Sequence, residues 1–288
     1  MQTVSDILAQ VKRVHFIGIG GSGMCPLVEI LHAGGWSISG SDNNESDNLT
    51  RLRGHGIAVY MGHDASHIEG AELVVYTNAV GEQNPELVAA RVKGIPVLER
   101  AVLLGLITRR YPNTVAVAGT HGKTTTSSML SQILLMADLD PAVFIGGRLP
   151  LIGANGRAGR SDTMVCEACE FKDHYLEMTP AISILLNVDA DHLDYFGDLD
   201  GVIRSFATFA AKTTGAVIYN ADDENTRRAV EGVTDARLIS YGTADGLGGH
   251  NHFPQTVCRC FCQIAVGGRF SVRDFLQQFP YQHLKGGS

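Results

Sequence analysis

Residues 115–130 read VAVAGTHGKTTTSSML, which is an apolar β-branched run, a turn with two glycines, a lysine, three threonines and a helical apolar pattern. This order predicts a phosphate-binding loop, because the backbone N–H groups of such a turn and the N-terminus of the following helix face an anion. Lys123 would add a positive charge and Thr124 a hydroxyl ligand for Mg²⁺. The usual spacing G-x-x-x-x-G-K-[ST] requires glycine five residues before Gly122, where this chain has Val117. The generic motif alone therefore does not establish that this segment is a phosphate-binding loop.

Acidic and imidazole side chains follow two other apolar runs. DTMVCEACE places Glu167 at the end of one predicted strand. Carboxylates and imidazole at the carboxyl edge of a parallel sheet are able to hold a metal beside a phosphate loop. The alternative is an ordinary polar surface turn. The second run, in AISILLNVDADHLDYF, is followed by five polar groups: Asn187, Asp189, Asp191, His192 and Asp194.

A second glycine-rich loop stands near the start of the chain. Residues 18–23 read GIGGSG, which fits G-x-G-x-x-G after a strand and before a helix, and Asp42 ends the next apparent strand 24 positions after Gly18. That is the dinucleotide-binding fingerprint in its expected context. The glycines alone would also suit a tight turn, and a dehydrogenase with Asp42 on a ribose fits the same pattern. The second nucleotide loop disfavours a dehydrogenase, because hydride transfer needs no separate ATP-type site.

Short apolar runs alternate with amphipathic segments along the chain, which predicts βαβ units and parallel sheets. The best linker is RRYPNT at 109–114, with a proline and a fall in hydrophobicity. The predicted fold class is therefore α/β, with a Rossmann-like parallel-sheet domain over residues 1–110 followed by a P-loop-type α/β ATP-binding domain over residues 111–288. The glycine-rich LPLIGANGRAGR, at 149–160, is predicted to be a mobile loop.

Composition narrows the classes of function. The chain has 288 residues, 44% of them hydrophobic and 18% charged, which suits two soluble domains. A net charge of −7 argues against a nucleic acid or an anionic membrane as partner, since such partners require clustered Lys and Arg. No run approaches the length of a membrane span, and the first residues lack the apolar region of a signal peptide, so we expect a cytoplasmic protein.

The six cysteines are expected to be reduced in that compartment. Two of them form a CxxC, but a strong zinc site needs a second pair at suitable spacing. Three others alternate as one face of a strand in TVCRCFCQIAV. Structural thiols are therefore favoured over a metal site. The cysteines are Cys25, Cys166, Cys169, Cys258, Cys260 and Cys262.

Several motifs occur together in the order of a known family. GTHGKTTT at 119–126, Glu167 in VCEACE, His192 in NVDADHLDYF and the opening HFIGIGGSGM resemble the Mur ligase family, the ATP-dependent enzymes that add amino acids to the peptidoglycan precursor. The resemblance runs from about residue 10 to 245. Folylpolyglutamate synthase shares the central chemistry, but usually has asparagine where His121 stands and lacks the N-terminal loop.

The resemblance implies a role for each matching residue. The family's phosphate loop is a shortened variant, so Val117 is expected. Lys123, Glu167 and His192 would be catalytic: Thr124 and Glu167 would hold one Mg²⁺, and His192 a second. The residues expected to bind ATP are Gly119, Thr120, His121, Gly122, Lys123, Thr124 and Thr125. Those expected to bind a UDP-linked substrate are Gly18, Gly20, Gly21, Ser22, Gly23 and Met24 at the pyrophosphate, Asp42 at the uridine, and Thr77 and Asn78 elsewhere on the sugar nucleotide.

The implied reaction joins L-alanine to UDP-N-acetylmuramate. ATP would phosphorylate the lactyl carboxylate to an acyl phosphate, which the amine then attacks. Lys123 and two Mg²⁺ ions would neutralise the anions brought together in each step. Attachment of a recycled murein tripeptide to the same sugar nucleotide is an alternative.

The chain departs from the family near its C-terminus. From the resemblance we expect a third domain for which the 288 residues leave no room, the Pro-Gly-x-His-Asn segment is not found, and RDFLQQFPYQHLKGGS does not align. Three hypotheses follow: a ligase with both sites but little turnover alone, a ligase completed by a separate C-terminal-domain polypeptide, and a non-catalytic nucleotide-sugar-binding module. The first is favoured.

Overall fold

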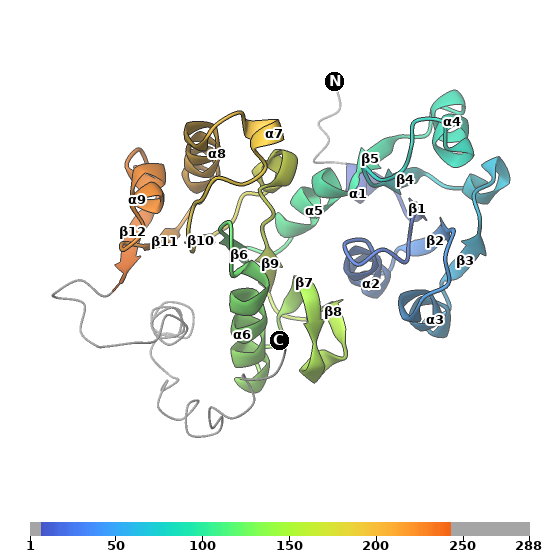
Figure 1. Cartoon of the computed structure of the whole chain (residues 1–288). Helices are drawn as coiled ribbons and strands as arrows, with labels where there is room; N and C mark the ends of the chain where they lie inside the picture. Colours follow the sequence, from blue (N-terminus) through green and yellow to red (C-terminus); the bar gives the residue numbers. More distant parts are fainter. Residues whose placement is uncertain (1–6, 243–288) are drawn as a thin grey trace.

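The computed structural model describes residues 7–242, in which the chain forms two β-sheets flanked by helices (Figure 1). The first sheet has five strands, all parallel, in the order β3-β2-β1-β4-β5. This arrangement confirms the predicted α/β class and the parallel sheet that carries the first glycine loop. The strands are β1 Arg13–Ile17, β2 Ser37–Asp42, β3 Ala58–Met61, β4 Leu73–Tyr76 and β5 Val97–Glu99.

Helices connect the strands of this sheet. After β3 the chain returns past β1 to form β4, so the strand order reverses between β1 and β4. A crevice at the carboxyl ends of two such strands is the usual ligand site of an open α/β sheet. The connecting helices are α1 Ile7–Gln10, α2 Cys25–Ala33, α3 Asp47–Gly54, η2 Ala65–Ile68, α4 Pro85–Val92 and α5 Arg100–Thr108.

The second sheet has seven strands in the order β12-β11-β10-β6-β9-β7-β8. Its neighbours are parallel except β7 and β8, which form an antiparallel hairpin at one edge. The central strands are apolar and buried on both faces, as expected of a parallel sheet covered by helices. The strands are β6 Asn113–Ala118, β7 Ala142–Leu149, β8 Ala154–Arg157, β9 Thr163–Glu167, β10 Ile182–Leu185, β11 Ala216–Asn220 and β12 Arg237–Tyr241.

The helices of the second half lie between these strands in the sequence. Figure 1 shows α6 beside the green strands and α8 and α9 near the orange edge of the sheet. They are α6 Lys123–Met136, η3 Pro150–Ile152, η4 Phe171–Glu177, α7 Leu193–Phe196, α8 Leu199–Ala211 and α9 Glu224–Val230.

The segment 149–160 is not the mobile loop that its glycines predicted. It contains η3 and the strand β8, and Ala154, Asn155 and Gly156 are buried. A Cβ atom at Gly156 would lie 2.3 Å from the Cβ of Pro26 in α2. This glycine therefore permits close packing, which sequence alone does not distinguish from flexibility.

The two sheets share a hydrophobic core. Leu27 and Val28 of α2 belong to the same buried cluster as Ala142 and Phe144 of β7. The side chain of Asn155 in β8 also donates a hydrogen bond to a backbone carbonyl of the first glycine loop. The hairpin β7–β8 is consequently packed against the glycine-loop side of the first sheet.

Two further sequence expectations concern membranes and cysteines. No helix within residues 7–242 is long and apolar enough to cross a membrane.

Cys25, Cys166 and Cys169 are free thiols, the first two buried. Burial raises the pKa of Cys25 to about 11 and also raises the pKa of Cys166 and Cys169. The other three cysteines, 258, 260 and 262, lie outside the described residues.

A fully buried carboxylate, Glu86 of α4, lies beneath the first sheet. The hydroxyl of Ser41 donates to Glu86 Oε2 at 2.5 Å, and His67 Nδ1 lies 2.7 Å from Oε1. His63 Nδ1 is 3.3 Å from Oε2, and His15 Nε2 is 3.7 Å away, beyond hydrogen-bond distance. Burial alone raises the pKa of this carboxyl, but the histidines and the hydroxyl outweigh burial and hold the pKa at about 2.

Glu86→Gln should lower the free energy of unfolding by about 3 kcal/mol at pH 7, because one partner of a buried charged network is removed. The folded-state pKa of about 2 lies below the ordinary 4.5, so the carboxylate stabilises the fold above pH 4.5 and loses this effect as the pH falls through 2. Urea unfolding should therefore show a large difference in unfolding free energy between Glu86→Gln and the wild type near pH 7, and a smaller difference near pH 3.

The matched control is Glu82→Gln, because the Glu82 side chain is 67% exposed and pairs only with a surface arginine. This variant should change the unfolding free energy by less than about 1 kcal/mol. Equal urea midpoints for Glu86→Gln and the wild type at pH 7 would contradict the stabilising role of the network.

Candidate functional site

The predicted strand-turn-helix at residues 115–130 is confirmed. Strand β6 ends at Ala118, and α6 begins at Lys123 with Gly122 as its N-cap at φ 85°. Gly119 has φ 146°, and a Cβ there would lie 2.9 Å from the Cβ of Leu186. Glycine is required at both positions, since L residues rarely adopt these angles and no space exists for a side chain at the first. The resulting turn leads directly into the N-terminus of α6.

Asn187 holds this loop in place. Its Oδ1 accepts from His121 N at 2.8 Å, and its Nδ2 donates to His121 O at 3.0 Å. Thr120 N donates to the Asn187 carbonyl at 3.0 Å, and Asp189 N donates to Thr120 Oγ1 at 2.8 Å. The segment after β10 therefore positions the loop after β6, and both the oxygen and the nitrogen of the Asn187 side-chain amide bond to the loop backbone.

Lys123 turns back over the loop. Its Nζ donates to Gly119 O at 2.5 Å and Thr120 O at 3.1 Å, and it forms an ion pair with Glu170 at 2.8 Å. The side chain of Glu170 is only 3% exposed, so this ion pair is shielded from water. Glu170 was not among the site residues predicted from the sequence. Its signal was the second acid of VCEACE, three residues after Glu167.

Thr124 and Glu167 meet beside Gly146 in β7. The Cβ that Gly146 lacks would lie 2.8 and 2.9 Å from the two Glu167 oxygens and 3.0 Å from Thr124 Oγ1. Glu167 Oε2 also accepts from Gly146 N at 2.8 Å. A hydroxyl and a carboxylate around a space kept free of side chain fit Mg²⁺, which prefers a few protein oxygens and several waters. We call this arrangement the Gly146 cradle.

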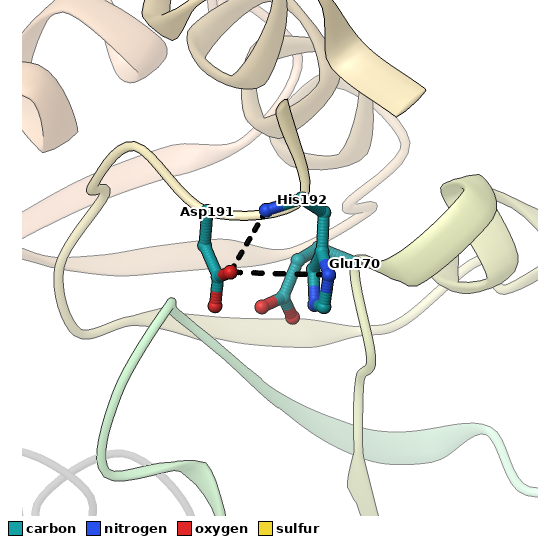
Figure 2. Close-up of side chains that lie close together, drawn as sticks. All are labelled: Glu170, Asp191 and His192. Atoms are coloured by element: carbon teal, nitrogen blue, oxygen red, sulfur yellow. Dashed lines mark hydrogen bonds and ion pairs between the residues drawn. The ribbon is translucent and has the colours of Figure 1, made fainter. Parts of the chain in front are cut away.

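A second group of metal-competent side chains lies nearby. Glu170, Asp191 and His192 offer ligand atoms that all lie within 4.8 Å of one another, and within residues 7–242 no other such group of three occurs. Figure 2 shows their side chains directed toward a common space, with Asp191 and His192 on the loop after β10 and Glu170 just before η4. Asp191 Oδ1 accepts from His192 N at 2.8 Å.

The backbone of His192 is unusual. Its φ of 52° lies in the left-handed region, which is uncommon for a residue other than glycine. The imidazole packs edge-on against Phe171, with ring centroids 4.9 Å apart. This packing holds the ring toward the group just described. Asp189 and Asp194, the other predicted acids of this loop, are exposed and outside the group.

The first glycine loop is held by β2. Gly18 N and Ile19 N donate to the Ser41 carbonyl at 2.8 and 3.0 Å, and Gly20 N donates to Asp42 Oδ2 at 2.9 Å. Asn48 Nδ2 donates to Gly20 O at 2.8 Å. Asp42, predicted at the uridine, thus supports the loop backbone. Gly21 and Ser22 are exposed, whereas Met24 is buried and immediately precedes α2.

Thr77 and Asn78 follow β4, on the other side of the strand-order reversal from Asp42. Asn78 Nδ2 lies 3.1 Å from Nε2 of His174 in η4. This contact joins a predicted substrate residue of the first sheet to the second half of the chain.

One cavity extends from the first glycine loop to the Gly146 cradle. Its volume is about 570 Å³, and it lies between the first glycine loop, α3 and the hairpin β7–β8. Ser22 of the glycine loop and Gly146 of the cradle both line it. The hairpin's contribution was missed from sequence because it depends on strand order. The remaining lining residues include Asn48, Arg51, Arg148 and Asn155.

The fold and the candidate site define a two-sheet α/β protein with two glycine loops. One of these loops leads into the N-terminus of a helix, beside clustered metal-competent side chains. Two family models match this chain: Mur ligase family, catalytic domain, over residues 13–112, and Mur ligase middle domain, over residues 117–258. The chain belongs to the Mur ligase family, as its motifs predicted.

Individual relatives agree. The UDP-N-acetylmuramate–L-alanine ligase of Clostridium acetobutylicum is 44% identical over 237 residues, covering 82% of this chain and 52% of the relative. The UDP-N-acetylmuramate–L-alanine ligase of Acetivibrio thermocellus is 46% identical over 233 residues, covering 80% of this chain and 50% of the relative. The chain thus spans about half the length of the curated relatives it matches.

Solved structures give the same answer. The UDP-N-acetylmuramate-alanine ligase of Thermotoga maritima matches with a TM-score of 0.71 and 29% identity, covering 81% of this chain and 53% of that one. The UDP-N-acetylmuramate:L-alanyl-gamma-D-glutamyl-meso-diaminopimelate ligase of Neisseria meningitides matches with a TM-score of 0.72 and 28% identity. This match covers 80% of this chain and 78% of that one.

Gly146→Ala should weaken Mg²⁺-dependent ATP binding at least about tenfold, because the added methyl would displace the Glu167 carboxylate and the Thr124 hydroxyl. The measurement is calorimetric titration with a non-hydrolysable ATP analogue, with and without Mg²⁺. The control is Gly54→Ala, where a new Cβ meets no atom within 4 Å. Wild-type affinity in Gly146→Ala would exclude the cradle as the Mg²⁺ position.

Proposed function

We propose that this chain carries the sugar-nucleotide and ATP sites of a UDP-N-acetylmuramate:L-alanine ligase. The relatives named for that activity support the reaction class. The observation that carries the proposal is the cavity lined by both Ser22 and Gly146, because a substrate bound at the first glycine loop would extend through it toward the cradle. Residues 1–110 would form the sugar-nucleotide domain and residues 111–288 the ATP domain.

Mur ligases are ATP-dependent enzymes that use Mg²⁺ in general. In this chain the backbone from Gly119 to Thr125, at the N-terminus of α6, would receive the ATP phosphates. Lys123 would exchange Glu170 and the loop carbonyls for phosphate oxygens, which are better partners for an ammonium group. The Gly18–Met24 loop, Asp42, Thr77 and Asn78 would bind the UDP-linked substrate.

Two Mg²⁺ positions follow from the two groups of side chains. Thr124 and Glu167 would hold one ion in the Gly146 cradle, and His192 would hold the other with Glu170 and Asp191. Bound Mg²⁺ supplies charge neutralisation for oxygens that would otherwise repel one another. The side chains themselves fix where that charge is held, and Asn187 keeps the phosphate loop aligned with it.

The chemistry requires such neutralisation, because a carboxylate is a poor electrophile. Transfer of the ATP γ-phosphoryl group to the lactyl carboxylate gives an acyl phosphate and ADP, and attack by the L-alanine amine then gives the amide and inorganic phosphate. The phosphoryl transfer brings anions together, so Lys123 and the α6 N-terminus would act by electrostatic positioning rather than by covalent catalysis.

A second candidate is a ligase that attaches a murein peptide. The match to the Neisseria ligase supports it, since its TM-score of 0.72 is close to the 0.71 of the Thermotoga enzyme. Both reactions use the same carboxylate and differ in the amine. Supplying either L-alanine or L-alanyl-γ-D-glutamyl-meso-diaminopimelate therefore separates them.

Phosphate release from ATP and Mg²⁺ should require UDP-N-acetylmuramate and the correct amine together. Lys123→Ala and Glu167→Ala should each lower this release at least about a hundredfold, because each removes a charge directed at the phosphates or at Mg²⁺. The measurement is phosphate release by the 288-residue chain with each substrate omitted in turn.

The control is Lys93→Ala, an exposed lysine of the first half of the chain. An unchanged rate in Lys123→Ala or Glu167→Ala would remove that residue from the site. If the wild-type chain releases no phosphate, calorimetry with UDP-N-acetylmuramate and with the ATP analogue distinguishes a binding module or a ligase that needs a separate polypeptide from a chain with neither site.

A further inference from the structure

Arg100 lies at the carboxyl edge of the first sheet, next to the strand-order reversal. It is the first residue of α5 and directly follows β5, which pairs with β4. The guanidinium lies against the end of the first glycine loop: a Cβ at Gly23 would be 3.3 Å from Arg100 Nη1 and 3.5 Å from its Cζ. The absence of a side chain at Gly23 therefore allows the arginine to lie against the loop.

The guanidinium of Arg100 forms no hydrogen bond or ion pair within residues 7–242, although the carboxylates of Glu99 and Asp173 act on the same neighbour, His174. The neighbouring carboxylate, Glu99, instead caps α5 by accepting from Ala101 N at 2.8 Å. Arg100 is also partly buried, so water compensates its charge only in part. Lys123 differs, because Glu170 already neutralises it.

Residues from the second half of the chain face the same place. His174 Nε2 accepts a hydrogen bond from Asn78 Nδ2. Burial lowers the pKa of His174, the negative charge of Glu99 opposes that shift, and the positive charge of Arg100 adds to it. A neutral His174 suits this acceptor role. Arg100 is thus a cation at a junction formed by the glycine loop, Asn78 and η4, where Lys172 of η4 is a second cation.

We propose that Arg100 is a substrate-binding residue whose guanidinium binds the diphosphate of a nucleoside diphosphate sugar lying across Gly23. The inference rests on the proposed function for the class of substrate and adds the residue that recognises its charge. The planar fork of arginine matches two phosphate oxygens at once, and lysine offers only a point charge. The backbone N–H groups of the loop alone carry no full charge.

The test is calorimetric binding of UDP, UDP-N-acetylglucosamine and UDP-N-acetylmuramate to the wild type, Arg100→Gln and Arg100→Lys. Arg100→Gln should weaken all three ligands by a similar factor of about tenfold to a hundredfold, and Arg100→Lys by less. The ³¹P resonances of bound UDP should also shift in Arg100→Lys, which a purely structural role would not cause.

Two measurements confirm that the variants are folded and the effect is local. Affinity for the ATP analogue with Mg²⁺ should stay within about twofold of the wild type in every variant, because within residues 7–242 Arg100 forms no hydrogen bond with the phosphate loop or the Gly146 cradle. Arg109→Gln, which removes an exposed arginine from the end of the same helix, should bind all UDP ligands as the wild type does.

Each contrary outcome has a distinct meaning. Unchanged affinity of Arg100→Gln for UDP, with normal wild-type binding, overturns the role of Arg100 and leaves the proposed function intact. A loss confined to UDP-N-acetylmuramate overturns the diphosphate assignment in favour of the lactyl carboxylate. A wild-type chain that binds none of the UDP ligands overturns this inference and the proposed substrate class together.

Discussion

The two hydrogen bonds between the Asn187 side chain and the backbone of His121 determine the shape of the phosphate loop. A loop built from glycine and small residues has many accessible conformations, and only a few of them direct its N–H groups toward one anion. Asn187 follows β10, and β10 pairs with β6 from Ile182 with Val115 to Leu185 with Ala118. The two hydrogen bonds therefore form only when β10 and β6 pair in this parallel register. The geometry of the site thus depends on the strand order of the sheet.

The charged groups of the protein differ in how completely the fold neutralises them. Glu86 is surrounded by a hydroxyl and histidines, and its carboxylate serves stability. Glu170 is paired with Lys123 at 2.8 Å, and its side chain is only 3% exposed. Glu167 receives one backbone N–H and otherwise faces the Gly146 cradle. Burial of charge is costly unless compensated, so groups with incomplete partners are those best suited to receive a ligand.

The junction of the two sheets decides how the loops face each other. Helix α2 begins directly after the first glycine loop and packs on the hairpin β7–β8, whose Gly156 permits contact with Pro26. Asn155 of the same hairpin holds the carbonyl of Ser22. The hairpin also supplies Gly146 to the cradle, so a single element contacts both candidate sites. A shift of this hairpin would alter the path between them.

Sequence by itself determined the features that depend on local order. The glycine angles, the following lysine and threonine, and the helix start are adjacent in GTHGKTTT, so strand, turn and helix were predictable, as was Glu167 at the end of a neighbouring strand. The family followed from several such motifs in order. Only the tertiary structure brought Glu170 to Lys123, Gly146 to Glu167 and Arg100 to Gly23. These contacts join residues far apart in the chain through the strand orders β1-β4-β5 and β6-β9-β7, which leave no period or spacing in the sequence. The prediction of a mobile loop at residues 149–160 was wrong for the same reason. A glycine permits either close packing of another segment or backbone flexibility, and the sequence does not show which until the neighbouring segment is known.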